Sequence, residues 1–285
     1  MTKKTQSAFR NPYSEIKKMT ILDKIITQKT IEIAQAKAQI STKELENSPY
    51  FQRKTNSLKA NLIHNSQLTT HNSGIIAEFK RKSPSKGIIN DQVLVEDVTH
   101  GYAQAGASGL SVLTDFEFFG GSKQDLFKAR AANPTTPILR KDFMIDEYQL
   151  LEAKAWGADV ILLIAANLTP LQVHTLAKEA KRLGLETLLE VHDEEELNRS
   201  LSEYIDIVGV NNRNLKNFVE QNVNASLDLA EKIPAGFVKI SESCIGSTEI
   251  IRQLRGVGYN GFLIGESFMK TQNPATALAE FIAGI

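Results

Sequence analysis

Short apolar runs alternate with helical stretches eight times along the chain, and this repeat constrains the fold more than any other feature. The runs are typical of buried strands and lie at 75–80, 109–114, 137–143, 159–166, 186–192, 207–213, 237–243 and 261–267. Their centres are roughly 27 residues apart, which is the length that one strand, one helix and two short loops require. Helices are expected at 94–105, 124–131, 146–156, 171–183, 194–201, 223–233, 248–256 and 274–283.

Eight such units predict an α/β fold, the (β/α)8 or TIM barrel, over residues 75–285. The alternative is a doubly wound open sheet, which usually has fewer strands and a Gly-x-Gly-x-x-Gly turn that this chain lacks. Residues 1–74 differ, because apolar residues recur at helical spacing in 20–40 while 41–74 is polar. We expect an N-terminal extension in which an amphipathic helix packs on the barrel and a short helix interrupts coil.

Composition excludes several classes of protein. The 33 Lys and Arg residues balance 33 Asp and Glu residues, so no net positive charge attracts nucleic acid or anionic lipid. The single cysteine, Cys244, and five histidines without ligand spacing predict neither a disulfide framework nor a metal site. The longest apolar run, 160–166, is far shorter than the ~20 residues of a membrane helix. The N-terminus lacks the apolar stretch of a secretory signal, so we expect a cytoplasmic protein.

Charged and polar side chains follow six of the predicted strands, at the end where a barrel places its chemistry. Residues two apart on a strand share a face, so Glu78 and Lys80 point together. Lys141 joins them if Ile76 and Leu139 face the barrel interior. A lone charge at a strand end is usually a solvated rim residue. Charges buried at this density, however, cost folding free energy unless they form ion pairs or serve a function. A functional pocket is therefore predicted, and it also receives Glu190, Asn211, Arg213 and Glu242.

The same pocket is expected to bind a phosphorylated, sugar-like small molecule. Lys80 and the lysine-rich loop 81–87 supply positive charge. The loops 243–247 and 265–267 are small and rich in available N–H groups, and barrels often bind phosphate after their last two strands. Cys244 lies beside this pocket, but no histidine can be placed near it, so it is not expected to act as a nucleophile.

Five motifs, in order and spacing, are similar to those of the indole-3-glycerol phosphate synthase family. They are AEFKRKSPSKG at 77–87, LRKDF at 139–143, LEV at 189–191, GVNNRNL at 209–215 and SES at 241–243. The resemblance begins near residue 20 and reaches the last residue. It implies conversion of 1-(2-carboxyphenylamino)-1-deoxyribulose 5-phosphate to indole-3-glycerol phosphate, carbon dioxide and water in tryptophan biosynthesis, without a cofactor or metal. Other tryptophan-pathway enzymes are candidate partners.

The resemblance also implies a role for each site residue. Lys141 is implied as the general acid that protonates the ribulose carbonyl, and Glu190 as the group that serves the proton transfers of dehydration. Lys80 is implied to hold the anionic groups of the substrate, and Arg213 and Asn211 its anthranilate part. The residues implied to position the lysines are Glu78 and Glu242. Further substrate contacts are implied for Ser83, Phe143, Leu215 and Ser243, and phosphate contacts for Lys80, Cys244, Gly265, Glu266 and Ser267.

Two pKa shifts and one strained position are expected. Cations around Lys141 should lower its pKa, and a partly apolar mouth should raise the pKa of Glu190. The family usually has glycine where this chain has Cys244, so a positive φ there would strain the cysteine.

Two other functions fit the sequence less well. Phosphoribosylanthranilate isomerase, also a barrel, usually uses a Cys/Asp pair near strands one and five, and Cys244 is at neither. A barrel kept as a binding module would be expected to lose Lys141 or Glu190, and both are present.

Overall fold

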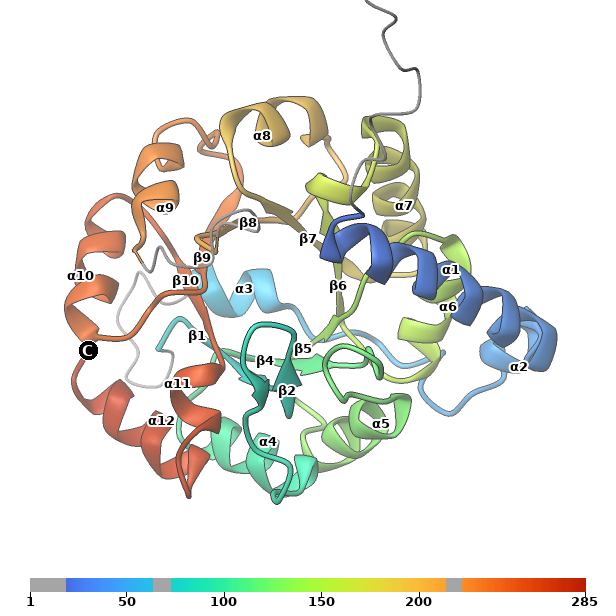
Figure 1. Ribbon diagram of the computed structural model, residues 1–285, viewed down its shortest axis with the longest axis horizontal. Helices are drawn as coiled ribbons and strands as arrows, with labels where there is room; N and C mark the ends of the chain where they lie inside the picture. The colour runs from blue at the N-terminus through green and yellow to red at the C-terminus, as the bar shows by residue number, and fades with distance from the viewer. Residues whose placement is uncertain (1–18, 64–72, 214–221) are drawn as a thin grey trace, which may run out of the picture.

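The computed structural model describes residues 19–63, 73–213 and 222–285. Its centre is a closed barrel of parallel strands in the order β1-β10-β9-β8-β7-β6-β5-β4 (Figure 1). The strands are β1 Ile75–Phe79, β4 Gly109–Leu113, β5 Ile138–Lys141, β6 Val160–Ile164, β7 Glu186–Val191, β8 Ile207–Asn211, β9 Val238–Glu242 and β10 Gly261–Ile264. Each predicted strand occurs within its predicted range, and the TIM barrel is confirmed.

Helices form a ring outside the strands (Figure 1). They are α4 Val95–Gln104, α5 Lys123–Ala132, α6 Glu147–Ala155, α7 Pro170–Arg182, α8 Glu194–Ser200, α9 Asn224–Leu229, α10 Thr248–Gly256, α11 Glu266–Met269 and α12 Pro274–Ala283. The helix predicted at 223–233 is shorter than expected, since α9 ends at Leu229. The strand predicted at 261–267 was also too long, since α11 begins at Glu266.

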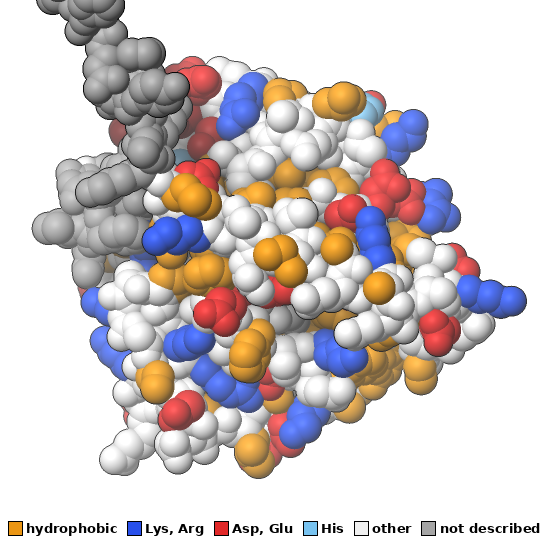
Figure 2. Space-filling model, turned by 45° about the vertical axis from the view of Figure 1, so that its right-hand side comes forward, with side chains coloured by type: hydrophobic (Ala, Val, Ile, Leu, Met, Phe, Trp, Pro, Cys, Tyr) orange, Lys and Arg blue, Asp and Glu red, His pale blue; other side chains and the backbone are white. Residues whose placement is uncertain are grey.

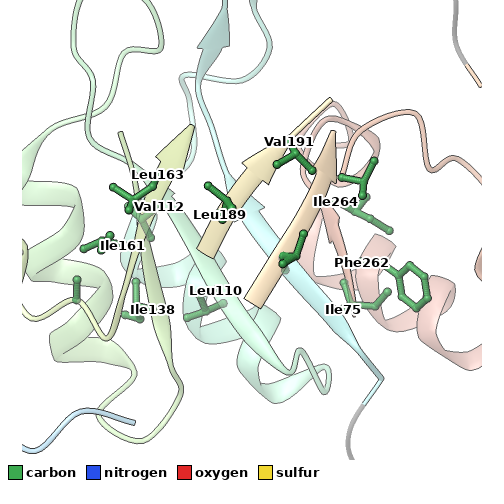
Figure 3. Close-up of a cluster of buried hydrophobic side chains, with 14 of the residues drawn as sticks. Ile75, Leu110, Val112, Ile138, Ile161, Leu163, Leu189, Val191, Phe262 and Ile264 are labelled. Carbon is green, nitrogen blue, oxygen red and sulfur yellow. The ribbon is translucent and has the colours of Figure 1, made fainter. Parts of the chain in front are cut away.

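The alternation of side chains along each strand divides the core in two. Ile76 and Leu139 belong to the cluster inside the barrel, as strand parity predicted, together with Leu162, Leu188 and Ile240. Residues on the opposite faces form a second cluster with the helices, part of which is shown in Figure 3. Because both faces of every strand are buried, the strands appear in the sequence as continuous apolar runs rather than as alternating apolar and polar residues.

The N-terminal extension contains α1 Ile21–Gln39, α2 Thr42–Glu46 and α3 Leu58–Ile63. α3 covers the end of the barrel where the strands begin, because Leu58 and Leu62 are buried in the interior cluster. Glu186, the first residue of β7, accepts hydrogen bonds from the backbone N–H groups of Leu58 and Lys59 at 2.9 and 3.0 Å. This carboxylate satisfies donors that the start of a helix leaves unpaired.

α1 lies at the opposite end of the barrel and is held there by a buried lysine. Lys29, only 4% exposed, places Nζ 2.9 Å from Asp115 and 3.0 Å from Asp142, which follow β4 and β5. Burial opposes the charge on Lys29, but the two carboxylates outweigh it and raise its pKa. The ion cluster therefore fixes α1 against the strand ends that carry the predicted pocket.

The surface agrees with the balanced composition. On the face shown in Figure 2, Lys and Arg side chains are interspersed with Asp and Glu. Among the residues that the structure describes, no helix is both long and apolar enough to cross a membrane.

Replacing Lys29 by Met should lower the free energy of unfolding by about 3–5 kcal/mol, because the Asp115 carboxylate would stay buried without its neighbouring ammonium. Lys37→Met is the matched control on the same helix, since Lys37 makes an exposed pair with Asp146 and its loss should cost at most about 1 kcal/mol. Urea unfolding of both variants measures the difference. Equal losses would contradict the role given to Lys29.

Candidate active site

A cavity of about 540 Å³ opens where the barrel strands end. The predicted residues that line it are Glu78, Lys80, Ser83, Lys141, Phe143, Glu190, Asn211, Arg213, Glu242, Ser243, Cys244, Gly265, Glu266 and Ser267. Leu215, also predicted, lies outside the described residues. The structure thus brings every predicted site residue that it describes to one cavity.

Lys141, the last residue of β5, lies between two buried carboxylates. Its Nζ is 2.7 Å from Glu190 Oε2 and 2.9 Å from Glu242 Oε2. The Asn211 side-chain amide donates a hydrogen bond to Glu190 Oε1 at 3.0 Å. These groups come from β5, β7, β8 and β9, which surround one barrel interior, so the barrel sets their spacing. In the described part of the chain, no group of three or more His, Cys, Asp or Glu side chains could hold a metal ion.

The two pKa shifts expected from the sequence were wrong in direction. Burial opposes the charge on Lys141, but Glu190, Glu242 and Glu78 outweigh it and raise its pKa, because its neighbours are carboxylates rather than cations. Burial raises the pKa of Glu190, but Lys141 and His192 outweigh it, so the pKa ends below its ordinary value. Burial and the nearby Glu190 raise the pKa of Glu242 to about 7. Lys141 is thus held as a cation and Glu190 as a carboxylate.

The second lysine of the site makes a similar pair. Lys80 Nζ lies 2.6 Å from Glu78 Oε1, and the two residues share a face of the chain at the end of β1. Ser111 donates a hydrogen bond to the other oxygen of Glu78 at 3.3 Å. Gly265 faces this carboxylate, and a Cβ there would lie 2.8 Å from Glu78 Cβ. Glycine at 265 therefore gives Glu78 its space.

Gly209 gives Glu242 its space in the same way, although it is not among the site residues predicted from the sequence. A Cβ at 209 would lie 2.3 Å from Glu242 Oε1 and 3.1 Å from Leu188 Cδ1. A glycine inside a buried strand is a signal of close approach by another group. That signal was present in the sequence, but the identity of the approaching group depends on the register of β8 with β9.

One wall of the cavity is apolar and comes partly from the N-terminal extension. Ile21, Leu22 and Ile25 of α1 line it. Phe119 and Phe143 also line the cavity, and their ring centroids lie 6.1 Å apart. The sequence predicted α1 as a helix, but none of its residues as part of the site, because helical spacing does not say where a helix docks.

The expected phosphate end of the cavity contains strained backbone and paired charges. Ser243 and Cys244 have φ values of 66° and 59°, so the strain expected at Cys244 is present. Burial raises the pKa of the Cys244 thiol. Glu266 pairs with Arg213, with 3.3 Å between Oε2 and Nη2.

The lysine-rich loop after β1 is a hairpin. β2 Lys82–Ser83 pairs antiparallel with β3 Gly87–Ile88. Arg81 anchors it, because its guanidinium donates two hydrogen bonds of 2.8 Å to Asp125 of α5. Lys82 donates to the carbonyl oxygen of Glu117, whereas Lys86 lines the cavity. The positive charge that this loop gives the cavity thus comes from Lys86.

Comparison with known proteins gives the family. The family model described as indole-3-glycerol phosphate synthase matches residues 22–281. The chain belongs to the indole-3-glycerol phosphate synthase family. An indole-3-glycerol phosphate synthase of Bacteroides thetaiotaomicron is 46% identical over 267 residues, which are 93% of this chain and 98% of that protein. One from Bordetella pertussis is 41% identical over 263 residues, which are 92% of this chain and 99% of that protein.

Solved structures of other enzymes share the fold of this family member. A 3-hexulose-6-phosphate synthase aligns with a TM-score of 0.57 at 14% identity, covering 74% of this chain and 99% of its own. A mutant tryptophan synthase alpha-subunit from Pyrococcus furiosus aligns with a TM-score of 0.57 at 14% identity, and the alignment covers 76% of this chain and 98% of that subunit. At this identity the likeness concerns the barrel alone.

Gly209→Ala should lower the free energy of unfolding by about 1–3 kcal/mol, because its Cβ overlaps the buried Glu242 carboxylate. Gly236→Ala is the control, since a Cβ there meets nothing within 4 Å. Thermal unfolding of both variants measures the effect. Similar stability of the two would mean that Glu242 moves aside without cost.

Cys244→Gly should raise the free energy of unfolding by roughly 0.5–1 kcal/mol, because glycine adopts positive φ without strain. Cys244→Ala removes the thiol but keeps Cβ, so it should not give this gain. Urea unfolding distinguishes them. A less stable Cys244→Gly would show that the side chain packs usefully.

Proposed function

We propose that the protein catalyses the conversion of 1-(2-carboxyphenylamino)-1-deoxyribulose 5-phosphate to indole-3-glycerol phosphate, carbon dioxide and water, as a carboxy-lyase of tryptophan biosynthesis. The observation that carries the proposal is the Lys141 ammonium, held between Glu190 and Glu242 in a cavity with an apolar wall. The names of the relatives support the same reaction. A cytoplasmic location and other enzymes of the tryptophan pathway as candidate partners belong to this proposal.

The cavity suits each part of this substrate. The apolar wall made by α1, Phe119 and Phe143 fits the aromatic ring of the anthranilate part. Asn211 ends β8, and Arg213 follows it; both line the same cavity and can bind the carboxylate of the anthranilate part. The loops at 243–246 and 265–267 present backbone N–H groups to the phosphate, with Lys86 and Lys80 as nearby cations.

Ring closure requires a proton at the ribulose carbonyl oxygen as the aromatic carbon attacks. Lys141 is protonated because its pKa is raised, and the two carboxylates fix the direction of its N–H groups. As negative charge develops on the carbonyl oxygen, that oxygen competes with the carboxylates for the proton. Lys141 is therefore proposed as the general acid.

Loss of carbon dioxide restores the aromatic ring and needs no dedicated group. Dehydration follows, in which the hydroxyl on the former carbonyl carbon takes a proton from Lys141 and leaves as water while a proton leaves the neighbouring ring carbon. The whole reaction takes up one proton from solvent. The lowered pKa of Glu190 keeps it ionised, so it can accept the proton from the ring carbon. Glu190 Oε2 is 2.7 Å from Lys141, to which it can return the proton.

Lys141→Ala should lower turnover by at least the ~10²–10⁴-fold typical of a general acid, with a much smaller effect on binding of a phosphorylated anthranilate analogue. Lys80→Ala should mainly raise KM, because it removes an anchor for ground-state anions. The rise of indole fluorescence measures turnover, and thermal unfolding checks that each variant is folded. Near-full activity of Lys141→Ala, or an equal loss of binding in both variants, would contradict the assignment.

A further inference from the structure

The second asparagine of the GVNNRNL motif is buried behind the cavity and binds the backbone of the loop that follows β9. The side-chain nitrogen of Asn212 donates hydrogen bonds to the carbonyl oxygens of Glu242 at 2.9 Å and Ser243 at 3.3 Å. The Asn212 backbone N–H also donates to the Glu242 carbonyl oxygen, at 2.9 Å. Asn212 therefore holds the peptide groups on both sides of Ser243.

A buried polar cluster fixes the direction in which the Asn212 amide faces. The backbone N–H of Ser226 in α9 donates a hydrogen bond to Asn212 Oδ1 at 3.0 Å. Because only the oxygen of an amide side chain can accept this bond, Nδ2 must face the carbonyl groups. Nδ2 also donates to Ser241 Oγ at 2.9 Å, and Ser241 Oγ lies 2.7 Å from Ser226 Oγ. Asn212 therefore has one orientation, which α9 and β9 fix together.

The backbone that Asn212 holds is strained. Ser243 and Cys244 have φ values of 66° and 59°, and no other non-glycine residue in the described part of the chain has positive φ. Such a conformation costs free energy in any residue with a Cβ, so it persists only where surrounding contacts determine it. Asn212 supplies such contacts, because it binds the carbonyl oxygen before Ser243 and the one after it.

The same contacts direct a backbone N–H toward the cavity. In a trans peptide group the N–H points opposite to the C=O, and no peptide bond in the described residues is cis. The Ser243 carbonyl faces Asn212, so the Cys244 N–H of the same peptide group faces away from it. Cys244 lines the cavity, whereas Asn212 does not. Since the Cys244 N–H donates no backbone hydrogen bond within the described part of the chain, it is available to an anion in the cavity.

We propose that Asn212 is a positioning residue for the phosphate of the substrate: it holds the Ser243 carbonyl away from the cavity and so directs the Cys244 N–H to a phosphate oxygen. The inference rests on the proposed function, which has the phosphate at this loop. A hydrogen bond to a charged phosphate oxygen is stronger than one between neutral groups. Without the Asn212 amide the strained backbone relaxes and this N–H turns away, so affinity falls only for ligands that carry a phosphate.

Asn212→Ala should weaken binding of a substrate analogue whose carbonyl is reduced to an alcohol by roughly tenfold or more, the effect of one lost hydrogen bond to a charged group. Binding of the same analogue without its phosphate should not change, a difference that a merely structural role would not give. Ser226→Ala is the matched control, because it removes a hydroxyl from the same cluster but keeps the backbone N–H that binds Asn212. Both of its affinities should match the wild type. Calorimetry measures the affinities, and thermal unfolding checks that each variant is folded.

The single cysteine of the chain allows a second test, in which the wild-type protein is used. Incorporation of ¹⁵N-cysteine labels one backbone N–H, that of Cys244, so its NMR resonance needs no assignment. The phosphorylated analogue and inorganic phosphate should each move this amide proton to lower field, and the analogue without phosphate should not. The shift should persist in Ser226→Ala and be much smaller in Asn212→Ala.

Three results would each overturn the role of Asn212. They are a Cys244 resonance that the phosphorylated analogue leaves unmoved, full affinity of Asn212→Ala for that analogue, and equal losses of affinity for both analogues. A wild-type protein without turnover whose Cys244 resonance still responds to inorganic phosphate would instead overturn the proposed function alone.

Discussion

The ammonium of Lys141 between Glu190 and Glu242 is the interaction on which the site depends. Each of these charges would be costly to bury alone, and each is acceptable because the others lie within hydrogen-bonding distance. Burial raises the pKa of Glu242 to about 7, because one ammonium cannot offset the burial of two carboxylates, while Lys141 and His192 bring the pKa of Glu190 below its ordinary value. The cluster therefore holds exchangeable protons in a largely enclosed place.

The closed barrel keeps this cluster in position, and β5 shows how. Lys141 contacts carboxylates inside the barrel, whereas its chain neighbours Arg140 and Asp142 contact helices outside it. Arg140 pairs with Glu152 of α6, and its guanidinium lies 4.0 Å from the centroid of Trp156. Asp142 contacts Lys29 of α1. The strand end that carries the proposed acid is thus fixed from the outside by two helices.

The N-terminal extension contacts both ends of the barrel. α3 covers the end where the strands begin, with Leu58 and Leu62 in the interior cluster. α1 contributes an apolar wall to the cavity at the other end. The polar segment between these two helices connects them along the outside of the barrel, where Tyr148 of α6 donates a hydrogen bond to the Ile40 carbonyl oxygen at 2.8 Å. The extension is part of the site as well as of the fold.

The sequence by itself determined the barrel and most of the candidate site. Strand length, the repeat of about 27 residues and strand parity are local properties, and they place Glu78, Lys141 and Ile76 on the inner face of a barrel. The tertiary structure decided what surrounds each charge. Carboxylates from other strands reverse the pKa shifts expected for Lys141 and Glu190, because a pKa depends on distances across the barrel rather than along the chain. For the same reason only the folded protein shows the docking of α1 and the hydrogen bonds of Asn212 to the loop after β9.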